Sequence, residues 1–264
     1  MRRALWALVL AVPLSALAQG NGVDWQRQVL RVTGDGPPDV RAANPSQARL
    51  GAERSAKKDA LADLLEQVKG LRLRADRTVG DEMVREDIRQ KVEDVLHGYK
   101  VVQKRYFSDS GVQLDVEVPL GALTAVLVTP APADTVAPAG TKANARDEAK
   151  TKKPARAKYS GLVVDARKLG MRPVLAPRLL DAAGQPLYGE ETLSAEARKT
   201  TGVAGYFGSL EQARKSALVG AKPLVLGAAR LQGSDLVLGL DGAKALAGLE
   251  PRLLAEGRVA ILIK

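Results

Sequence analysis

Residues 129–158 place the strongest constraint on this chain, because they cannot belong to a packed core. They read TPAPADTVAPAGTKANARDEAKTKKPARAK, with four Pro, nine Ala, seven basic and three acidic residues and no apolar periodicity. A segment of this composition buries too little apolar surface to offset the entropy of ordering it. It therefore predicts a flexible linker between two domains, at about 19–128 and 159–264.

The N-terminus has the pattern of a secretory signal peptide. Arg2 and Arg3 precede an apolar stretch over 4–14, and Ala16-Leu17-Ala18 fits a small-residue cleavage site. The alternative is a retained anchor helix. No later stretch approaches about twenty apolar residues, so we expect residues 1–18 to be a signal peptide and the mature chain to be an exported, soluble protein.

Cysteine content and charge narrow the function classes. The 264 residues include no cysteine, which excludes disulfides, thiolate metal sites, a Cys nucleophile and lipid attachment at the mature N-terminus. The formal charge is +10, and removing residues 1–18 takes away two Arg and no acid, which leaves +8. This excess favours anionic partners: lipid head groups, polyanionic glycans or acidic proteins. Export argues against nucleic acid.

The first domain begins with a predicted strand over Trp25 to Val32, which ends at a Gly34-Asp35-Gly36 turn before two prolines. Asn44-Pro45-Ser46-Gln47 then predicts a helix start with Asn as N-cap, Pro at N1 and Gln reaching back to the cap. Small apolar residues recur every four positions after it. This pattern predicts a helix over 45–69 that lies close against a sheet.

A second helix is predicted from Thr78 to His97, with Val84 among the residues on its inner side. Strands follow over 99–107 and 112–118. The second of these strands alternates strictly between Val or Leu and polar residues. The alternation predicts a sheet with one buried side and one solvent-facing side.

The second domain is predicted to be richer in strands. Ser194 and Ser209 read as helix N-caps, with the second helix over 210–218, and Asp241 reads as the cap of a short helix that Pro251 restarts. The predicted strands are 161–165, 173–180, 186–188, 223–230, 235–240 and 258–263. The fold class is α+β: two small α/β domains with mixed or antiparallel sheets, joined by a flexible linker.

The sequence gives little support for catalysis. The single histidine, His97, ends a predicted helix, where a cation complements the helix dipole. One histidine and no cysteine leave few metal ligands, and no calcium loop, nucleophile elbow or dinucleotide fingerprint is present. Four carboxylates could in principle serve glycan cleavage, which uses a pair held across a sugar. They are Asp165, Asp181, Glu190 and Glu191, and nothing in the sequence selects a pair. We expect no catalytic residue, no cofactor and no metal.

The linker supplies the one candidate binding cluster. Five cations lie close together in it and could contact an anionic lipid or glycan surface; the alternative is that they only solvate the linker. They are Lys150, Lys152, Lys153, Arg156 and Lys158. No aromatic residues are interleaved with them, which again argues against nucleic acid.

These features resemble a known family. The Gly-x-Gly-Pro turn, the helix with Ala48, Ala52, Ala56 and Ala60, and the closing hairpin are similar to the small domain of LPP-type outer-membrane lipoproteins and of the flagellar envelope proteins FlgP and FlgT. The run YSGLVVDAR, the following RPVLAP and Tyr188-Gly189, and the later GAKPLVLGAARLQGSDLVLGLDGAKAL and VAILIK resemble the middle domain of FlgT-type proteins.

The resemblance implies a non-enzymatic protein of the periplasm or outer membrane, here without the lipobox cysteine. It implies partners among envelope or flagellar proteins, or further copies of the chain. The sequence therefore predicts a structural or assembly factor that acts through protein contacts, with a periplasmic glycan-binding or glycan-cleaving protein as the alternative.

Overall fold

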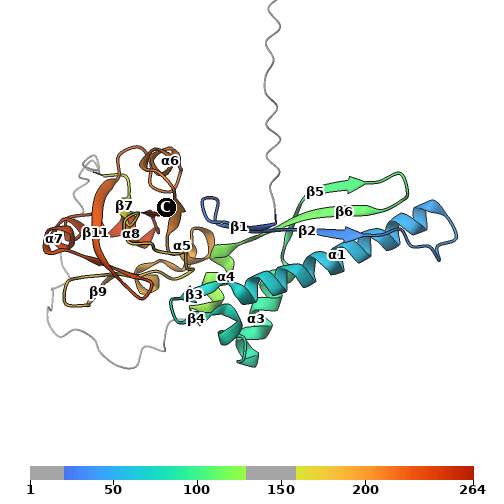
Figure 1. Ribbon diagram of the computed structural model, residues 1–264, viewed down its shortest axis with the longest axis horizontal. Coiled ribbons are helices and arrows are strands. Elements are labelled where there is room, and N and C mark those ends of the chain that lie inside the picture. The colour runs from blue at the N-terminus through green and yellow to red at the C-terminus, as the bar shows by residue number, and fades with distance from the viewer. Residues whose placement is uncertain (1–20, 129–158) are drawn as a thin grey trace, which may run out of the picture.

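The computed structural model describes residues 21–128 and 159–264, so the predicted signal peptide and linker lie outside the described residues. The predicted α+β class is confirmed. Residues 21–128, called here the first unit, form an elongated arm, and residues 159–264, the second unit, form a rounder body beside one end of that arm (Figure 1).

The first unit is a four-stranded antiparallel sheet in the order β1-β2-β6-β5, with the long helix α1 across one face (Figure 1). A small hairpin and three shorter helices gather where the arm meets the second unit. The elements are β1 (Gly22–Asp24), β2 (Val29–Gly36), α1 (Pro45–Gly70), β3 (Arg72–Arg74), β4 (Arg77–Thr78), α2 (Val79–Glu82), α3 (Glu86–His97), β5 (Lys100–Tyr106), β6 (Val112–Pro119) and α4 (Leu120–Leu127).

The predicted α1 is confirmed, including its cap. The Asn44 side chain accepts a hydrogen bond from the backbone N–H of Gln47, and the Gln47 side chain reaches back to the N–H of Ala43, one residue before the cap. The helix buries its small-residue stripe of Ala52, Ala56 and Ala60 against the sheet.

The prediction that Gly34-Asp35-Gly36 forms a turn was wrong. These residues are the end of β2 and pair with β6. A Cβ on Gly34 would stand 2.2 Å from the carbonyl oxygen of Ala56, and one on Gly36 would stand 1.9 Å from that of Ala52. The glycines therefore serve close packing of α1 on β2, not chain reversal. The chain reverses earlier, at Trp25–Gln28, within the stretch that was predicted to be a strand.

The predicted helix from Thr78 to His97 is also divided. Thr78 caps α2, but the helix stops after one turn and α3 starts at Glu86. Val84 lies in the break and is exposed, which contradicts its predicted inward position. The hairpin β3–β4 before it had no sequence prediction.

The side of the sheet opposite α1 is polar, and part of it is buried. Glu117 and Asp115 of β6 are buried, because neighbouring strands place arginines over them. Arg31 donates to Glu117 from its Nε at 2.9 Å, and Arg105 contacts Asp115 at 2.8 Å. The predicted solvent-facing side is therefore only partly exposed, because cross-strand ion pairs cover these two carboxylates.

The second unit holds a seven-stranded mixed sheet in the order β10-β13-β7-β11-β12-β8-β9. The four strands β10, β13, β7 and β11 run parallel, and antiparallel pairs join β11 to β12 and β8 to β9. The elements are β7 (Leu162–Asp165), β8 (Leu179–Leu180), β9 (Pro186–Tyr188), the 3-10 turn η1 (Glu190–Thr192), α5 (Ala195–Thr200), β10 (Gly205–Phe207), α6 (Leu210–Lys215), β11 (Leu224–Gln232), β12 (Asp235–Leu238), α7 (Leu240–Ala247), α8 (Pro251–Ala255) and β13 (Val259–Leu262).

Most predicted elements of this unit are present, with three corrections. The predicted strand over 173–180 is a buried coil that becomes a strand only at Leu179, because its prolines interrupt backbone pairing. Helix α6 ends at Lys215, short of the predicted 218. Asp241 lies inside the first turn of α7, whose cap position is Gly239. The edge strand β10 was not predicted.

Candidate functional site

The five cations of the predicted anionic-surface contact, Lys150, Lys152, Lys153, Arg156 and Lys158, lie outside the described residues. Their role stays a prediction. His97 is the last residue of α3 and is exposed, as its position at a helix end predicted.

The four carboxylates considered for glycan cleavage are held in separate local settings. Asp165 pairs with Arg167 at 2.6 Å, and this guanidinium lowers the pKa of the Asp165 carboxyl below its ordinary value. Asp181 accepts the backbone N–H of Gln185 at 2.8 Å and closes a turn. Glu191 is exposed on η1.

Glu190 instead joins the two units. It is buried on η1, and one of its carboxylate oxygens contacts the guanidinium of Arg74 in the β3–β4 hairpin. Its other oxygen has no hydrogen-bond partner among the described residues. The ion pair with Arg74 is therefore the main compensation for burying this charge.

The same hairpin makes further contacts across the boundary. The carbonyl oxygens of Arg72 and Leu73 accept hydrogen bonds from the backbone N–H groups of Leu175 and Ala176, at 2.9 and 3.1 Å. The Ser234 hydroxyl accepts from the N–H of Ala75 at 3.1 Å. Backbone pairing of this kind fixes the register between the units and not merely their proximity.

Apolar packing is continuous across the boundary. One cluster of buried side chains includes Leu120 and Leu123 of α4 together with Ala197 of α5 and Tyr206 of β10. Gly121 lets α4 approach the α5 backbone closely, since a Cβ there would stand 2.6 Å from the carbonyl oxygen of Lys199. The two units therefore share one core in the part of the chain that the structure describes.

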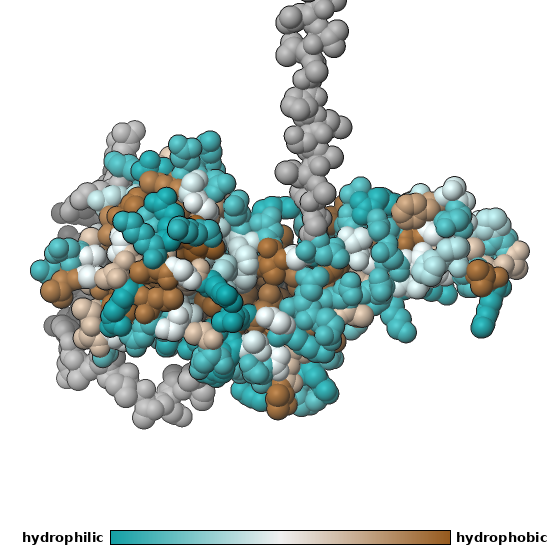
Figure 2. Space-filling model, in the orientation of Figure 1, coloured by the Kyte–Doolittle hydropathy of each residue, from teal (hydrophilic) through white to brown (hydrophobic). Residues whose placement is uncertain are grey.

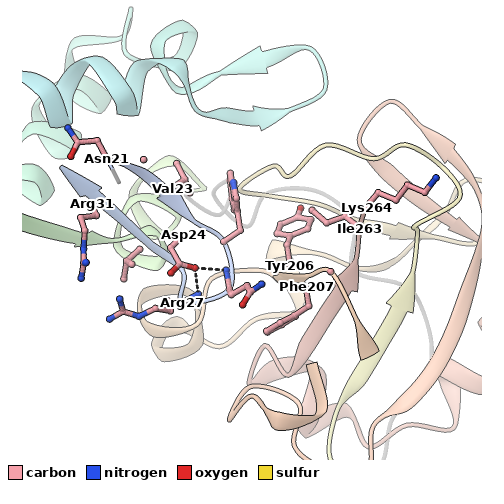
Figure 3. Close-up of a pocket in the computed structure, with 14 residues that line it drawn as sticks. Asn21, Val23, Asp24, Arg27, Arg31, Tyr206, Phe207, Ile263 and Lys264 are labelled. Atoms are coloured by element: carbon pink, nitrogen blue, oxygen red, sulfur yellow. Dashed lines mark hydrogen bonds between the residues drawn. The ribbon is translucent and has the colours of Figure 1, made fainter. Parts of the chain in front are cut away.

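A groove of about 620 Å³ lies beside this shared core and is the candidate functional site. One wall is β1, an edge strand of the first sheet, with the turn that follows it. The other wall is β10, an edge strand of the second sheet, with the end of β13. Figure 3 shows Asn21, Val23, Asp24, Arg27 and Arg31 on the first wall and Tyr206, Phe207, Ile263 and Lys264 on the second, with the Lys264 side chain directed away from the first wall.

Hydrogen bonds with Asp24, Gln28 and Tyr206 hold the turn that places Trp25 at the groove. Asp24 accepts the backbone N–H groups of Gln26 and Arg27, at 3.0 and 2.9 Å. The Trp25 carbonyl accepts from the Gln28 side chain and from the N–H of Tyr206. Gln28 has a φ of 57°, a conformation that a non-glycine residue adopts at some cost.

The Trp25 ring is also fixed by an aromatic contact. It meets Tyr206 edge to face, with the ring centroids 5.4 Å apart. The Tyr206 hydroxyl in turn donates to the carbonyl of Val174 and accepts from its N–H, so the second wall is anchored in the interior. Burial raises the pKa of Tyr206, which stays a neutral phenol.

The electrostatic character of the groove is basic. Its lining contains the cations Arg27, Arg31 and Lys264 and one side-chain carboxylate, that of Asp24, which accepts two backbone N–H groups. Glu117 lies behind the first wall and pairs closely with Arg31, whereas its contact with the half-exposed Arg27 is longer, at 3.4 Å. Arg27 is therefore the cation best placed to meet an anionic group in the groove.

The arrangement is suited to recognition of an extended chain. An edge strand such as β1 offers backbone donors and acceptors that an added strand can satisfy, whereas on β10 the N–H of Tyr206 already donates to Trp25. The arginine and tryptophan side chains supply charge and contact area. Sequence reasoning missed this site because its two walls are about 180 residues apart in the chain and neither carries a motif. Trp25 and the basic residues after it were the available signal, and they had been assigned to a strand.

Comparison with known proteins bears on the second unit. Residues 161–264 match the family model described as the second domain of Treponema pallidum Tp0624. No curated protein matches the chain. The similarity relates the fold of the second unit to that domain and carries no activity with it, and the resemblance to FlgP and FlgT stays a prediction.

Proposed function

We propose that this chain is an exported, non-enzymatic protein of the bacterial envelope that works by binding other envelope proteins. The basic groove between β1 and β10 carries the proposal, since it is a preformed hollow whose two walls are strand edges. Its partner is an extended polypeptide segment with an acidic side chain for Arg27. An assembly factor of a flagellar or other envelope-spanning ring is the setting that the family resemblance implies.

The positions and partners of the acidic residues support a binding role over glycan cleavage. Asp165, Asp181 and Glu190 each have a structural partner, and none of them lines the groove. Cleavage would need two carboxylates facing one sugar across a shared cleft.

Within 21–128 and 159–264 no helix has the length and apolar content to span a membrane.

Site-specific cross-linking in cells tests the proposal. A photo-cross-linking amino acid at the exposed groove residue Gln26 is expected to yield an adduct with an envelope protein, identified by mass spectrometry. The same amino acid at Lys244 of α7, which is exposed and is not part of the groove lining, is the matched control. Arg27→Glu, which reverses the groove's accessible charge, is expected to abolish the Gln26 adduct.

Adducts of equal yield at both positions, or adducts that survive Arg27→Glu, would contradict binding through the groove. Adducts with peptidoglycan strands would favour the glycan-binding alternative. Comparing tagged protein in cells with and without flagella then decides the setting: loss of its discrete localisation in cells without flagella supports a flagellar ring, and unchanged localisation supports another envelope assembly.

A further inference from the structure

A small pocket of about 180 Å³, called here the boundary pocket, lies where the first unit meets the second and shares no lining residue with the groove. The β3–β4 hairpin contributes Arg72 and Ala75 to its lining, the loop after β7 contributes Met171 and Arg172, and the turn between β11 and β12 contributes Ser234. Figure 1 shows the hairpin at the end of the arm beside the second unit, and Figure 2 shows hydrophilic surface where this end meets the second unit.

Hydrogen bonds between the units hold the walls of the boundary pocket in place. The backbone N–H of Leu175 donates to the carbonyl of Arg72 at 2.9 Å, which brings the loop that carries Arg172 against the hairpin. The N–H of Ala75 donates to the Ser234 hydroxyl at 3.1 Å. The pocket is therefore formed by the fold itself, as small-molecule sites usually are.

The charge of the lining is positive. Residues 72–75, 170–174 and 231–234, which span the lining, contain three arginines and no acidic residue. One of the three, Arg74, is paired with Glu190. Arg72 and Arg172 are exposed and form no ion pair with any described residue, so two guanidinium charges remain at the pocket.

The carboxylates that flank these segments do not cancel that charge. Asp235 pairs with Arg178 at 2.6 Å. Asp76 is exposed in the hairpin turn, is not part of the lining, and forms no ion pair with either lining arginine. The pocket therefore keeps an excess of positive charge, which favours an anionic ligand.

Uncharged donors of the lining complement the arginines. Ser234 is 8% exposed, and its hydroxyl accepts the Ala75 N–H while its own proton has no acceptor in the described chain. The backbone N–H groups of Met171 and Arg172 likewise donate to no described residue. These donors are satisfied only when solvent or a ligand supplies acceptor oxygens.

We propose that the boundary pocket binds a phosphate group, held by Arg72, Arg172 and the Ser234 hydroxyl. The donors come from three segments, and a tetrahedral phosphate presents oxygens in several directions, whereas a carboxylate presents two in one plane. Guanidinium groups match phosphate in geometry as well as in charge. The volume is below the roughly 300–1,000 Å³ of pockets that enclose drug-sized ligands, so the pocket suits the phosphate group and not a whole larger molecule.

Titration calorimetry with inorganic phosphate, at constant ionic strength in chloride, tests the proposal on the chain from residue 19 onward. Arg72→Gln and Arg172→Gln are each expected to weaken phosphate binding about tenfold, because each removes a charge-assisted hydrogen bond. Arg54→Gln is the matched control, since Arg54 is exposed on α1 and forms no ion pair with a described residue. Its phosphate affinity is expected to equal that of the unchanged chain, and circular dichroism confirms that each variant is folded.

The same phosphate chemistry is offered by free phosphate and by the head groups of phospholipids, and dimethyl phosphate separates these two sources. Tighter binding of inorganic phosphate than of this diester supports the proposal with free phosphate as the ligand. Equal or tighter binding of the diester supports it with a phospholipid head group as the ligand.

Failure of inorganic phosphate and dimethyl phosphate to bind the unchanged chain would overturn the proposal. Unchanged affinity in both Arg72→Gln and Arg172→Gln would overturn it too, because phosphate would then bind elsewhere, such as at the basic residues of 129–158. An equal loss of affinity in Arg54→Gln would mean a general effect of charge, and tighter binding of acetate than of either phosphate would assign the pocket to a carboxylate. None of these readouts depends on the groove between β1 and β10.

Discussion

Replacing Gly36 with alanine tests the close packing of helix α1 against strand β2. Gly36 is a residue of β2 with an ordinary strand backbone, so alanine introduces no conformational strain there. The added Cβ would nevertheless stand 1.9 Å from the carbonyl oxygen of Ala52 in α1. Both groups belong to backbone segments, so no side-chain rotation can relieve the overlap.

The size of the effect follows from this geometry. Contacts shorter than 3.0 Å are essentially never made by real Cβ atoms, so α1 must move off the sheet by about 1 Å, from 1.9 to 3.0 Å. That displacement loosens the buried stripe of Ala52, Ala56 and Ala60 along the helix. Overpacking in a core costs about 1–3 kcal/mol and more when backbone must shift. We expect Gly36→Ala to lower the free energy of unfolding by about 3 kcal/mol.

Urea denaturation followed by far-ultraviolet circular dichroism measures this change, with the slope of the transition checked for constancy. Gly227→Ala in β11 is the matched control, because a Cβ there meets nothing within 4 Å. Alanine at that strand position is expected to be neutral or stabilising, by up to about 1 kcal/mol. If both variants lose the same stability, or if neither does, the close approach of α1 to β2 is refuted.

Three further variants or conditions have defined outcomes. Arg74→Met leaves Glu190 buried and unpaired and is expected to cost about 3 kcal/mol in urea denaturation, most of which Glu190→Gln added to it should restore; equal costs for the single and double variants would count against the ion pair. Asn44→Ala is expected to cost about 1 kcal/mol by removing the cap of α1, and no change would contradict the capping hydrogen bond. Burial raises the pKa of Tyr188 and Tyr206, so each contributes stability that is fully present below about pH 10 and is lost as the pH rises through the folded-state value. In an absorbance titration, the phenols of both tyrosines should therefore ionise only when the protein unfolds at high pH. Tyr206→Phe should reduce the absorbance change of that unfolding step and leave the ionisation of the other tyrosines unchanged.

Several features of the fold could be predicted from local sequence because local physics decides them. The cap at Asn44 and the small-residue stripe of α1 specified a helix that packs closely, and the alternation in β6 specified a strand. The same alternation did not reveal that Asp115 and Glu117 would be buried, since that depends on which strands bring arginines over them. A polar residue at a period-two position indicates a face, but its exposure is set by its neighbours in space.

By itself the sequence determined the α+β class and most of the helices and strands, because caps, prolines and apolar periodicity act over a few residues. It gave no indication that the units on either side of 129–158 share a core, that Glu190 pairs with Arg74, or that Trp25 borders a groove with β10. Those features were decided only by the tertiary structure, because they join residues more than 70 positions apart through packing and charge pairing. Such contacts produce no periodic pattern in the sequence.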